Sequence, residues 1–220
     1  MSRKVIILGG TGNGTVIAHA MIDARNRGQG EWEFSGFLND RTVSGTSIEE
    51  LPVLGRIKDA PAYVDKGYYF INTIYRIDGQ KERIDLFESL SIPEERLATF
   101  VHPETYQATD VHLEPGVVLM PLTGISAGVS IGKGSLIMVG ATIGHNTRIG
   151  AYCHIAAQAC LSSFCIIGRG VHIGLNASVR ENITMEDFSA LGMGSVLLQN
   201  AGTQEIWAGN PARFLRRSDD

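Results

Sequence analysis

Two hydrophobic periods divide the chain near residue 100. Before that point, short apolar stretches alternate with segments in which apolar residues recur every three or four positions. The first pattern indicates strands and the second indicates helices. The expected strands cover residues 4–8, 32–38, 51–54, 68–72 and 97–101, and the expected helices cover 15–27 and 80–90. Because strands that alternate with helices are typical of βαβ units, residues 1–102 are predicted to form a small Rossmann-like α/β domain.

After residue 100 the helical period gives way to a strict repeat of six residues. Steps of six from Leu113 to Leu197 meet fifteen positions, all aliphatic or Met. From Val129 to Ser195, the position two residues before each of these is nearly always small. One large and one small inward side chain per strand fit a narrow triangular prism, in which three hexads make one coil. Residues 103–220 are therefore predicted to form a parallel β-helix.

The prediction extends to the details of this β-helix. With 18 residues per coil, residues 113–202 make about five coils, stacked about 4.8 Å apart. A glycine directly after the aliphatic position, as at Gly132 and Gly144, suits the tight corners between strands.

Composition and charge narrow the class of protein. With 44% hydrophobic residues and a net charge of -4, the chain is expected to be globular, without the basic patch that nucleic acid requires. The apolar stretch Val5–Leu8 is too short for a signal peptide or a membrane span, so a cytoplasmic location is expected. Cys153, Cys160 and Cys165 form no metal-ligand pair and are interpreted as reduced thiols.

Several segments resemble the hexapeptide-repeat acyltransferases: the hexad array, the run 143–150 (IGHNTRIG) and the tail 207–213 (WAGNPAR). More narrowly, the whole chain looks like the bacillosamine N-acetyltransferase and sialic-acid O-acetyltransferase group. That group shares a Gly-rich first turn, a strand ending near 37–40 and a Val-His-Pro segment at 101–103 that leads into the β-helix. The resemblance implies a left-handed parallel β-helix and a homotrimer. It also implies acetyl-CoA between neighbouring β-helices, and a sugar or nucleotide-sugar acceptor held by the N-terminal domain.

Acyl transfer from a thioester requires a base for the acceptor proton and donors for the developing oxyanion. Of the six histidines, His145, His154 and His172 lie on the coils. His145 follows inward Ile143 by two positions and is expected to point outward at a corner, where the resemblance makes it the general base. Relatives usually carry an acidic residue next, whereas this chain has Asn146. An amide can orient the imidazole but cannot stabilise the imidazolium as a full charge would.

The resemblance assigns further roles along the coils. Contacts with acetyl-CoA are expected from His154, Ser163, Leu175, Met193, Gly194 and Arg213. Among these, His154 contacts the thioester or pantetheine, the backbone near Ser163 offers an oxyanion donor, and Arg213 meets a phosphate. His172 is expected to face solvent.

The Gly-rich turn 9–14 follows a strand and opens a helix, so its amides suit a diphosphate. It lacks the G-x-G-x-x-G spacing, which disfavours NAD and leaves a nucleotide-sugar pocket as the interpretation. The acceptor-binding residues expected there are Thr11, Gly12, Asn13, Asn39 and Asp40. Relatives typically have His at position 13 and acidic residues at 39 and 40. In the long stretch 71–79, Tyr75 and Arg76 face either the acceptor or the surface.

The preferred function is transfer of acetyl to the amine of a nucleotide-linked amino-deoxy-sugar. A sugar hydroxyl is the second choice of acceptor, and a weakly catalytic binding or assembly trimer is the alternative that Asn13 and Asn146 suggest. Repeats alone would also fit an inert scaffold. A carbonic anhydrase is disfavoured because no H-x4-H pair is present and His154 and His172 lie 18 residues apart, so no metal is expected. A covalent mechanism through Cys160, expected to point outward, is disfavoured as well.

Overall fold

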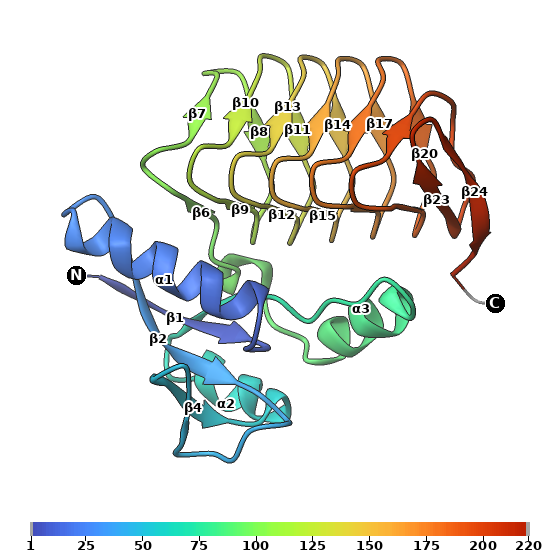
Figure 1. Cartoon of the computed structure of the whole chain (residues 1–220). Helices are drawn as coiled ribbons and strands as arrows, with labels where there is room; N and C mark the ends of the chain where they lie inside the picture. Colours follow the sequence, from blue (N-terminus) through green and yellow to red (C-terminus); the bar gives the residue numbers. More distant parts are fainter. Residues whose placement is uncertain (1, 219–220) are drawn as a thin grey trace.

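The computed structural model describes residues 2–218. A small α/β part precedes a triangular prism of stacked strands, and the two lie side by side (Figure 1). The α/β part holds a five-stranded sheet of order β3-β4-β2-β1-β5, in which β1 pairs in parallel with both β2 and β5. Its strands are β1 Arg3–Leu8, β2 Trp32–Leu38, β3 Ser47–Ile48, β4 Leu51–Gly55 and β5 Tyr69–Asn72. Its helices are α1 Asn13–Asn26, α2 Ala60–Val64 and α3 Gln80–Ser89, with short 3-10 helices at Ile57–Asp59 and Glu94–Arg96. The predicted Rossmann-like arrangement is confirmed.

One expected strand differs from the structure. Within residues 97–101, Leu97 forms only an isolated bridge with Phe70, and Phe100–Val101 pairs with the prism instead. Phe100 is buried between the two parts, and this burial accounts for its apolar character. Helix α2 and strand β3 were not predicted, because five and two residues are too few to show a period.

The prism is built from three sheets that we name by position, and their strands are parallel except for the antiparallel pair β23 and β24. The domain-facing sheet packs against the α/β part and contains β6 Phe100–Val101, β9 Val118–Leu119, β12 Leu136–Ile137, β15 His154–Ile155, β18 His172–Ile173, β21 Ala190–Leu191, β23 Glu205–Gly209 and β24 Ala212–Arg217. The second sheet contains β7 Tyr106–Gln107, β10 Gly124–Ile125, β13 Thr142–Ile143, β16 Cys160–Leu161, β19 Ser178–Val179 and β22 Val196–Leu197. The third sheet contains β8 His112–Leu113, β11 Ser130–Ile131, β14 Arg148–Ile149, β17 Ile166–Ile167 and β20 Thr184–Met185.

Strand pairing follows the predicted repeat. Ile125 pairs with Ile143 and Ile143 pairs with Leu161, each 18 residues on, and their side chains are buried in the prism. The left-handed β-helix is therefore confirmed. It begins earlier than the hexads indicated, at β6 and β7, because Gln107 occupies an aliphatic position and conceals the repeat.

The corners between strands depend on two different positions. From Leu113 to Leu191, the third residue after each inward aliphatic or Met side chain adopts a positive φ, 59° at Asn146 and 60° at Phe164. The glycine directly after the aliphatic residue meets a different need: a Cβ on Gly132 would lie 2.6 Å from the backbone of the next coil. The predicted glycine corners are therefore correct in place, but their cause is contact between coils.

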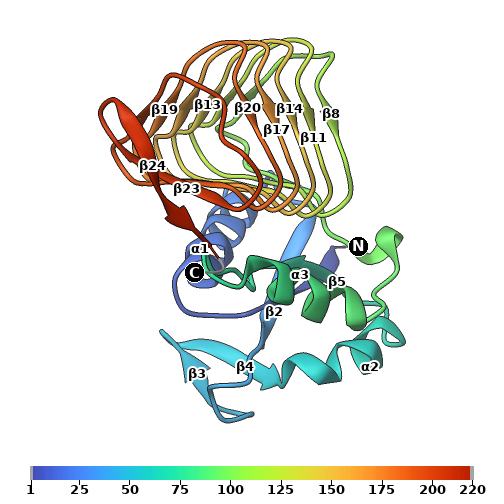
Figure 2. The same ribbon diagram turned by 90° about the vertical axis from the view of Figure 1, so that its right-hand side faces the viewer.

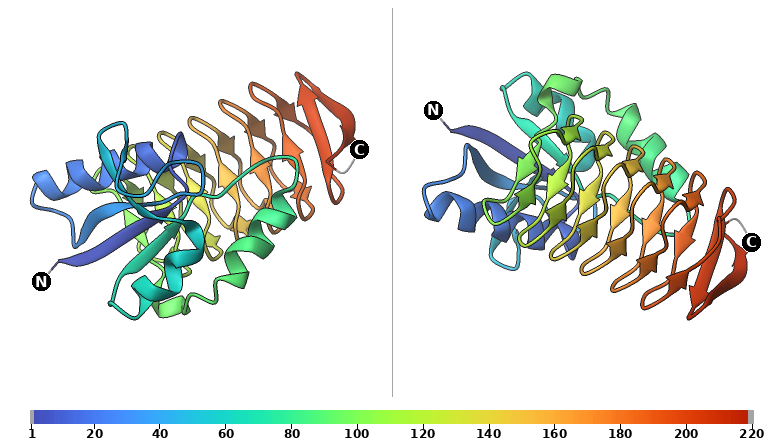
Figure 3. Two further views of the ribbon diagram at one scale, coloured as in Figure 1. Left: turned by 90° about the horizontal axis from the view of Figure 1, so that it is seen from below. Right: turned by 90° about the horizontal axis from the view of Figure 1, so that it is seen from above.

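Helices α1 and α3 both lie under the domain-facing sheet (Figures 2 and 3). Ile17 and Met21 of α1 share a core with Leu136 of β12. Phe87 of α3 packs with its ring centroid 5.8 Å from that of Tyr152. The α/β part is thus held against the coils along most of their length.

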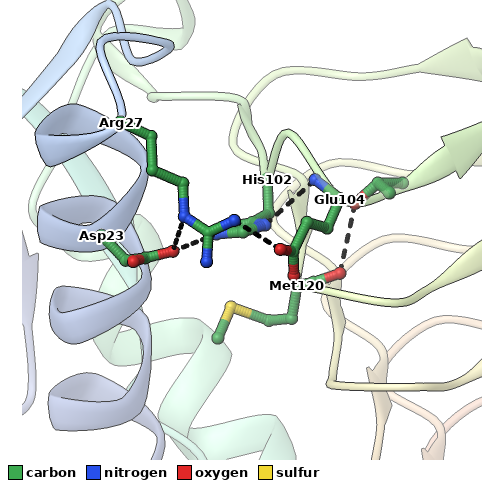
Figure 4. A network of polar contacts seen from close by, with 6 residues as sticks. Asp23, Arg27, His102, Glu104 and Met120 are labelled. Carbon is green, nitrogen blue, oxygen red and sulfur yellow. Dashed lines mark hydrogen bonds and ion pairs between the residues drawn. The ribbon is translucent and has the colours of Figure 1, made fainter.

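A buried histidine fixes α1 to the first coil (Figure 4). His102 is 1% exposed, and its Nε2 lies 3.3 Å from Asp23 Oδ2. Its Nδ1 accepts the backbone N–H of Glu104 at 3.2 Å, so the proton must sit on Nε2 and point to Asp23. Arg27 bridges Asp23 and Glu104. The predicted boundary between residues 102 and 103 falls within this contact and stays a prediction.

Candidate active site

The carboxyl ends of β1, β2 and β5 open into a cavity of 280 Å³, which we call the turn cavity. The Gly-rich turn before α1 forms one wall, with Gly9, Gly10 and Thr11. Three arginines are among the other residues that line it: Arg41, Arg76 and Arg83. Parallel α/β sheets bind ligands at this edge, and guanidinium groups beside a helix start suit phosphate.

Asn39 and Asp40, two of the expected acceptor residues, line the turn cavity and also hold its shape. The Asn39 side chain donates to the Gly9 carbonyl at 3.0 Å and accepts the backbone N–H of Arg41 at 2.8 Å. Asp40 Oδ1 accepts the backbone N–H of Ile57 at 3.0 Å. These contacts fasten the strand end to both neighbouring loops. Thr11 shares the cavity, whereas the position of a Gly12 Cβ is open space.

A second cavity of 480 Å³, the coil groove, lies between α1 and the edge of the domain-facing sheet. Along it, Val139, Ala157, Leu175 and Met193 occupy the same corner of successive coils. With about 4.8 Å per coil, this row is about 14 Å long. Its apolar walls suit an extended, mostly apolar ligand segment.

A chain of polar side chains crosses the coil groove. Asn13 Nδ2 lies 2.9 Å from His154 Nε2, and His154 Nδ1 lies 3.1 Å from His172 Nδ1. The two imidazoles stack at 5.1 Å, and the Tyr75 ring stacks on both, at 4.7 Å from His154 and 5.3 Å from His172. Asn13 therefore departs from the expected acceptor group and joins the coil groove instead.

Burial keeps both histidines uncharged. Desolvation lowers the pKa of His154 from 6.5 to about 3, with the neighbouring His172 as a smaller cause. Desolvation alone lowers the pKa of His172 to about 4. The prediction that His172 faces solvent is therefore wrong, because the loop carrying Tyr75 covers it. Tyr75 itself is buried enough to raise its pKa, and its hydroxyl has no hydrogen-bond partner within residues 2–218.

His145 lies at a different corner, between β13 of the second sheet and β14 of the third. Its Nδ1 is 2.9 Å from Asn146 Oδ1, and its ring meets the edge of Phe164 at 5.0 Å. The amide oxygen only accepts, so Nδ1 carries the proton and Nε2 keeps a lone pair. Ser163 occupies the same corner one coil further on.

One chain does not bring all the expected residues together. Leu175, Met193 and Gly194 share the coil-groove corner, and His154 lies on the adjoining strand. Arg213 continues the same sheet on β24, where its guanidinium donates to the Ala212 carbonyl at 3.1 Å. In contrast, His145, Asn146 and Ser163 lie across the whole width of the second sheet.

Sequence reasoning missed the environment of His172 and two arginines of the turn cavity, Arg41 and Arg83, whereas Arg76 was expected to face either the acceptor or the surface. The spacing of 18 between His154 and His172 did indicate that they stack on adjacent coils. Nothing in the sequence indicated that Tyr75 would cover them, since Tyr75 lies 79 residues before His154 and 97 residues before His172.

The remaining expectations concern cysteines, metals and membranes. Cys153 and Cys165 are buried and Cys160 is exposed, and burial raises the pKa of Cys153 to about 12. Within residues 2–218, no group of three or more His, Cys, Asp and Glu side chains is placed to hold a metal ion. No helix in that range has the length and apolar character that a membrane crossing requires.

Two solved structures are similar to nearly the whole chain. The acetyltransferase domain of PglB from Neisseria gonorrhoeae, in complex with acetyl coenzyme A, is 25% identical with a TM-score of 0.82, covering 98% of this chain and 100% of that one. PerB from Caulobacter crescentus, in complex with CoA and GDP-perosamine, has a TM-score of 0.81 at 23% identity, covering 97% of each chain. The second likeness bears on the fold alone.

Curated proteins are similar to parts of the chain. A UDP-3-O-acylglucosamine N-acyltransferase from a Caulobacter species is 32% identical over 121 residues, which are 46% of this chain and 36% of that protein. The chain spans about a third to a half of the length of the curated relatives it matches. The family model for the bacterial transferase hexapeptide (six repeats) matches residues 128–163. The chain thus matches this family model over part of its repeats and has the fold of the PglB acetyltransferase domain.

Proposed function

We propose that this protein transfers the acetyl group of acetyl-CoA to the amine of a nucleotide-linked amino-deoxy-sugar. The observation that carries the proposal is the coil groove, an apolar channel about 14 Å long that the side chains of Asn13, His154 and His172 cross. Such a channel suits the pantetheine arm of CoA. The likeness to the PglB domain in complex with acetyl coenzyme A supports this donor.

The acceptor site proposed is the turn cavity. Arg41, Arg76 and Arg83 supply positive charge for a diphosphate, and the start of α1 adds its backbone dipole. Asn13 connects the two cavities, since it begins α1 and its side chain reaches His154. An acceptor anchored by its phosphates would thus place its sugar toward the coils. The UDP-sugar relative supports an amine on a nucleotide sugar.

His145 is proposed as the general base, in a site shared by two copies. Its Nε2 lone pair points away from Asn146, and the Ser163 backbone N–H on the next coil donates to no group within residues 2–218. In the reaction, the acceptor amine attacks the thioester carbonyl while Nε2 takes the amine proton. The oxyanion forms beside Ser163, and its collapse breaks the carbon–sulfur bond. The CoA thiolate that leaves takes up a proton from the imidazolium, which returns His145 to its neutral form.

Because the base and the coil groove lie at different corners of one prism, we propose a homotrimer. In a cyclic trimer, the His145 corner of one copy can meet the coil groove of the next. We place the reaction in the cytoplasm, where an exposed unpaired thiol such as that of Cys160 persists.

The experiment follows thiol release from acetyl-CoA with a panel of nucleotide-linked amino sugars, and identifies the acetylated product by mass spectrometry. A parallel thermal-shift series uses CoA and the same sugars separately. Release of thiol with formation of an N-acetyl product supports the proposal. Stabilisation by neither CoA nor any nucleotide sugar would overturn the proposal. Acetylation of a hydroxyl would show that the acceptor group is a sugar hydroxyl and not an amine.

A further inference from the structure

The ring nitrogens of His154 are both occupied by the protein itself. Nε2 meets the Asn13 amide nitrogen at 2.9 Å, and Nδ1 meets His172 Nδ1 at 3.1 Å. His154 is also buried, with 7% of its surface exposed. It therefore has no ring nitrogen left for a ligand in the coil groove, although the sequence assigned that contact to it.

His172 is the last member of the hydrogen-bonded series that runs from Asn13 through His154, and one of its ring nitrogens is not occupied. It lines the coil groove, and its Nε2 makes no hydrogen bond within residues 2–218. Tyr75 is the only residue of that range with an enclosed side-chain polar atom lacking a partner, so His172 Nε2 is not sealed off. The groove thus offers one unused ring nitrogen.

The order of donors fixes the proton on that nitrogen. The Asn13 amide nitrogen only donates, so His154 Nε2 accepts and His154 carries its proton on Nδ1. That proton points to His172 Nδ1, which accepts, so His172 carries its own proton on Nε2. Burial lowers the pKa of both rings to about 3 and about 4, so the chain stays neutral in ordinary buffers.

We propose that the His172 Nε2–H donates a hydrogen bond to a carbonyl oxygen of the acyl-pantetheine arm of acyl-CoA. Asn13 and His154 are positioning residues, because they hold His172 in the tautomer that donates. The other groove side chains that are not part of this polar chain, including Val16, Leu175 and Met193, are apolar. A side-chain donor held in one tautomer among apolar side chains favours one depth for a carbonyl of the arm. This inference rests on the proposed donor.

The first test reads the tautomers without any ligand. In protein labelled with ¹⁵N-histidine, His172 should show a protonated Nε2 and an unprotonated Nδ1. Asn13→Asp supplies only acceptors at this place, so at about pH 8.5 it should reverse both rings and leave His172 Nε2 unprotonated. An unprotonated Nε2 in the parent protein, or the same pattern in Asn13→Asp, would overturn the inference.

The second test measures dissociation constants for acetyl-CoA and CoA by calorimetry. His172→Phe keeps the ring stack but removes the donor, and should weaken binding about tenfold, the usual worth of one hydrogen bond. His172→Gln keeps a hydrogen-bond donor and should lose less affinity than His172→Phe. The control is His19→Phe, the same change on the exposed face of α1.

The losses of affinity for acetyl-CoA and for CoA in His172→Phe, taken together, identify which carbonyl accepts the hydrogen bond. A larger loss for acetyl-CoA than for CoA supports the thioester oxygen, and equal losses support a pantetheine amide. Unchanged affinity for both ligands in His172→Phe overturns the inference while leaving the proposed function in place. A parent protein that binds neither ligand instead overturns the proposed function.

Discussion

The side chains of His145 and Asn146, neighbours in the chain, are joined by a hydrogen bond of 2.9 Å between Nδ1 and Oδ1. Asn146 can reach back to the ring because it adopts a φ of 59°, a conformation that Asn tolerates well. The amide thus does for ring orientation what a carboxylate would do, without its charge. This contact weighs against a merely structural role for the corner.

Asn146→Asp tests that contact. Asp also tolerates the left-handed conformation, so the fold should be kept. The new carboxylate stabilises the protonated imidazole, which moves the acidic limb of the rate profile to higher pH. Above that limb the ring is neutral in both proteins, and the variant should equal or exceed the parent because its base is stronger. An unchanged pH profile of acetyl transfer would show that residue 146 does not contact the base.

Stability should fall in mild acid because of His154 and His172. Both have pKa values lowered below 6.5 in the folded state, so the unfolded chain binds more protons between about pH 6.5 and about pH 4. The contribution of these two histidines to the free energy of unfolding is therefore fully present above pH 6.5 and declines as the pH falls. Each histidine accounts for about 1–2 kcal/mol at about pH 5.

Urea unfolding at about pH 7.5 and pH 5 measures this decline. His172→Phe, which keeps the ring stack, should lose clearly less stability between the two conditions than the parent. Equal declines in the two proteins would mean that His172 is not buried uncharged.

The contact between Asp23 of α1 and His102 of the first coil should contribute more to the free energy of unfolding than an exposed ion pair does. Asp23→Ala leaves the buried His102 N–H without an acceptor, which costs about 1–3 kcal/mol. Glu31→Ala is a matched control, because it removes a carboxylate paired with Arg3 at an exposed site and should cost less than about 1 kcal/mol. Similar unfolding free energies for the two variants would deny His102 this role.

The two halves of the fold were predictable to different depths. Each coil repeats one local packing problem, so a period of six residues is enough to predict the β-helix and its inward side chains. The candidate site depends instead on contacts between distant segments. Asn13 and His154 are 141 residues apart, and neither carries a local signal of their hydrogen bond. The loop with Tyr75 likewise shows its function only once it lies on His172.

The separation of His145 from the coil groove could not be predicted from the repeat alone. The hexads assign both to outward positions, but the choice between edges of the prism requires knowing which sheet faces the α/β part. That choice is made by apolar outward residues such as Val118 and Leu136, which are buried against α1. The six-residue repeat is defined by inward positions and does not include these outward residues.

The central claim is that the active site forms between two copies, and mixed trimers test it most directly. His145→Ala removes the base, and Ala157→Trp fills the coil groove at an outer corner. Each variant alone should lose at least about a hundredfold in acetyl transfer. Coexpressed in equal amounts, the two should recover about one quarter of parent activity, because half the copies keep the base and half of their neighbours keep the groove. Mixed trimers no more active than either variant alone would contradict a shared site.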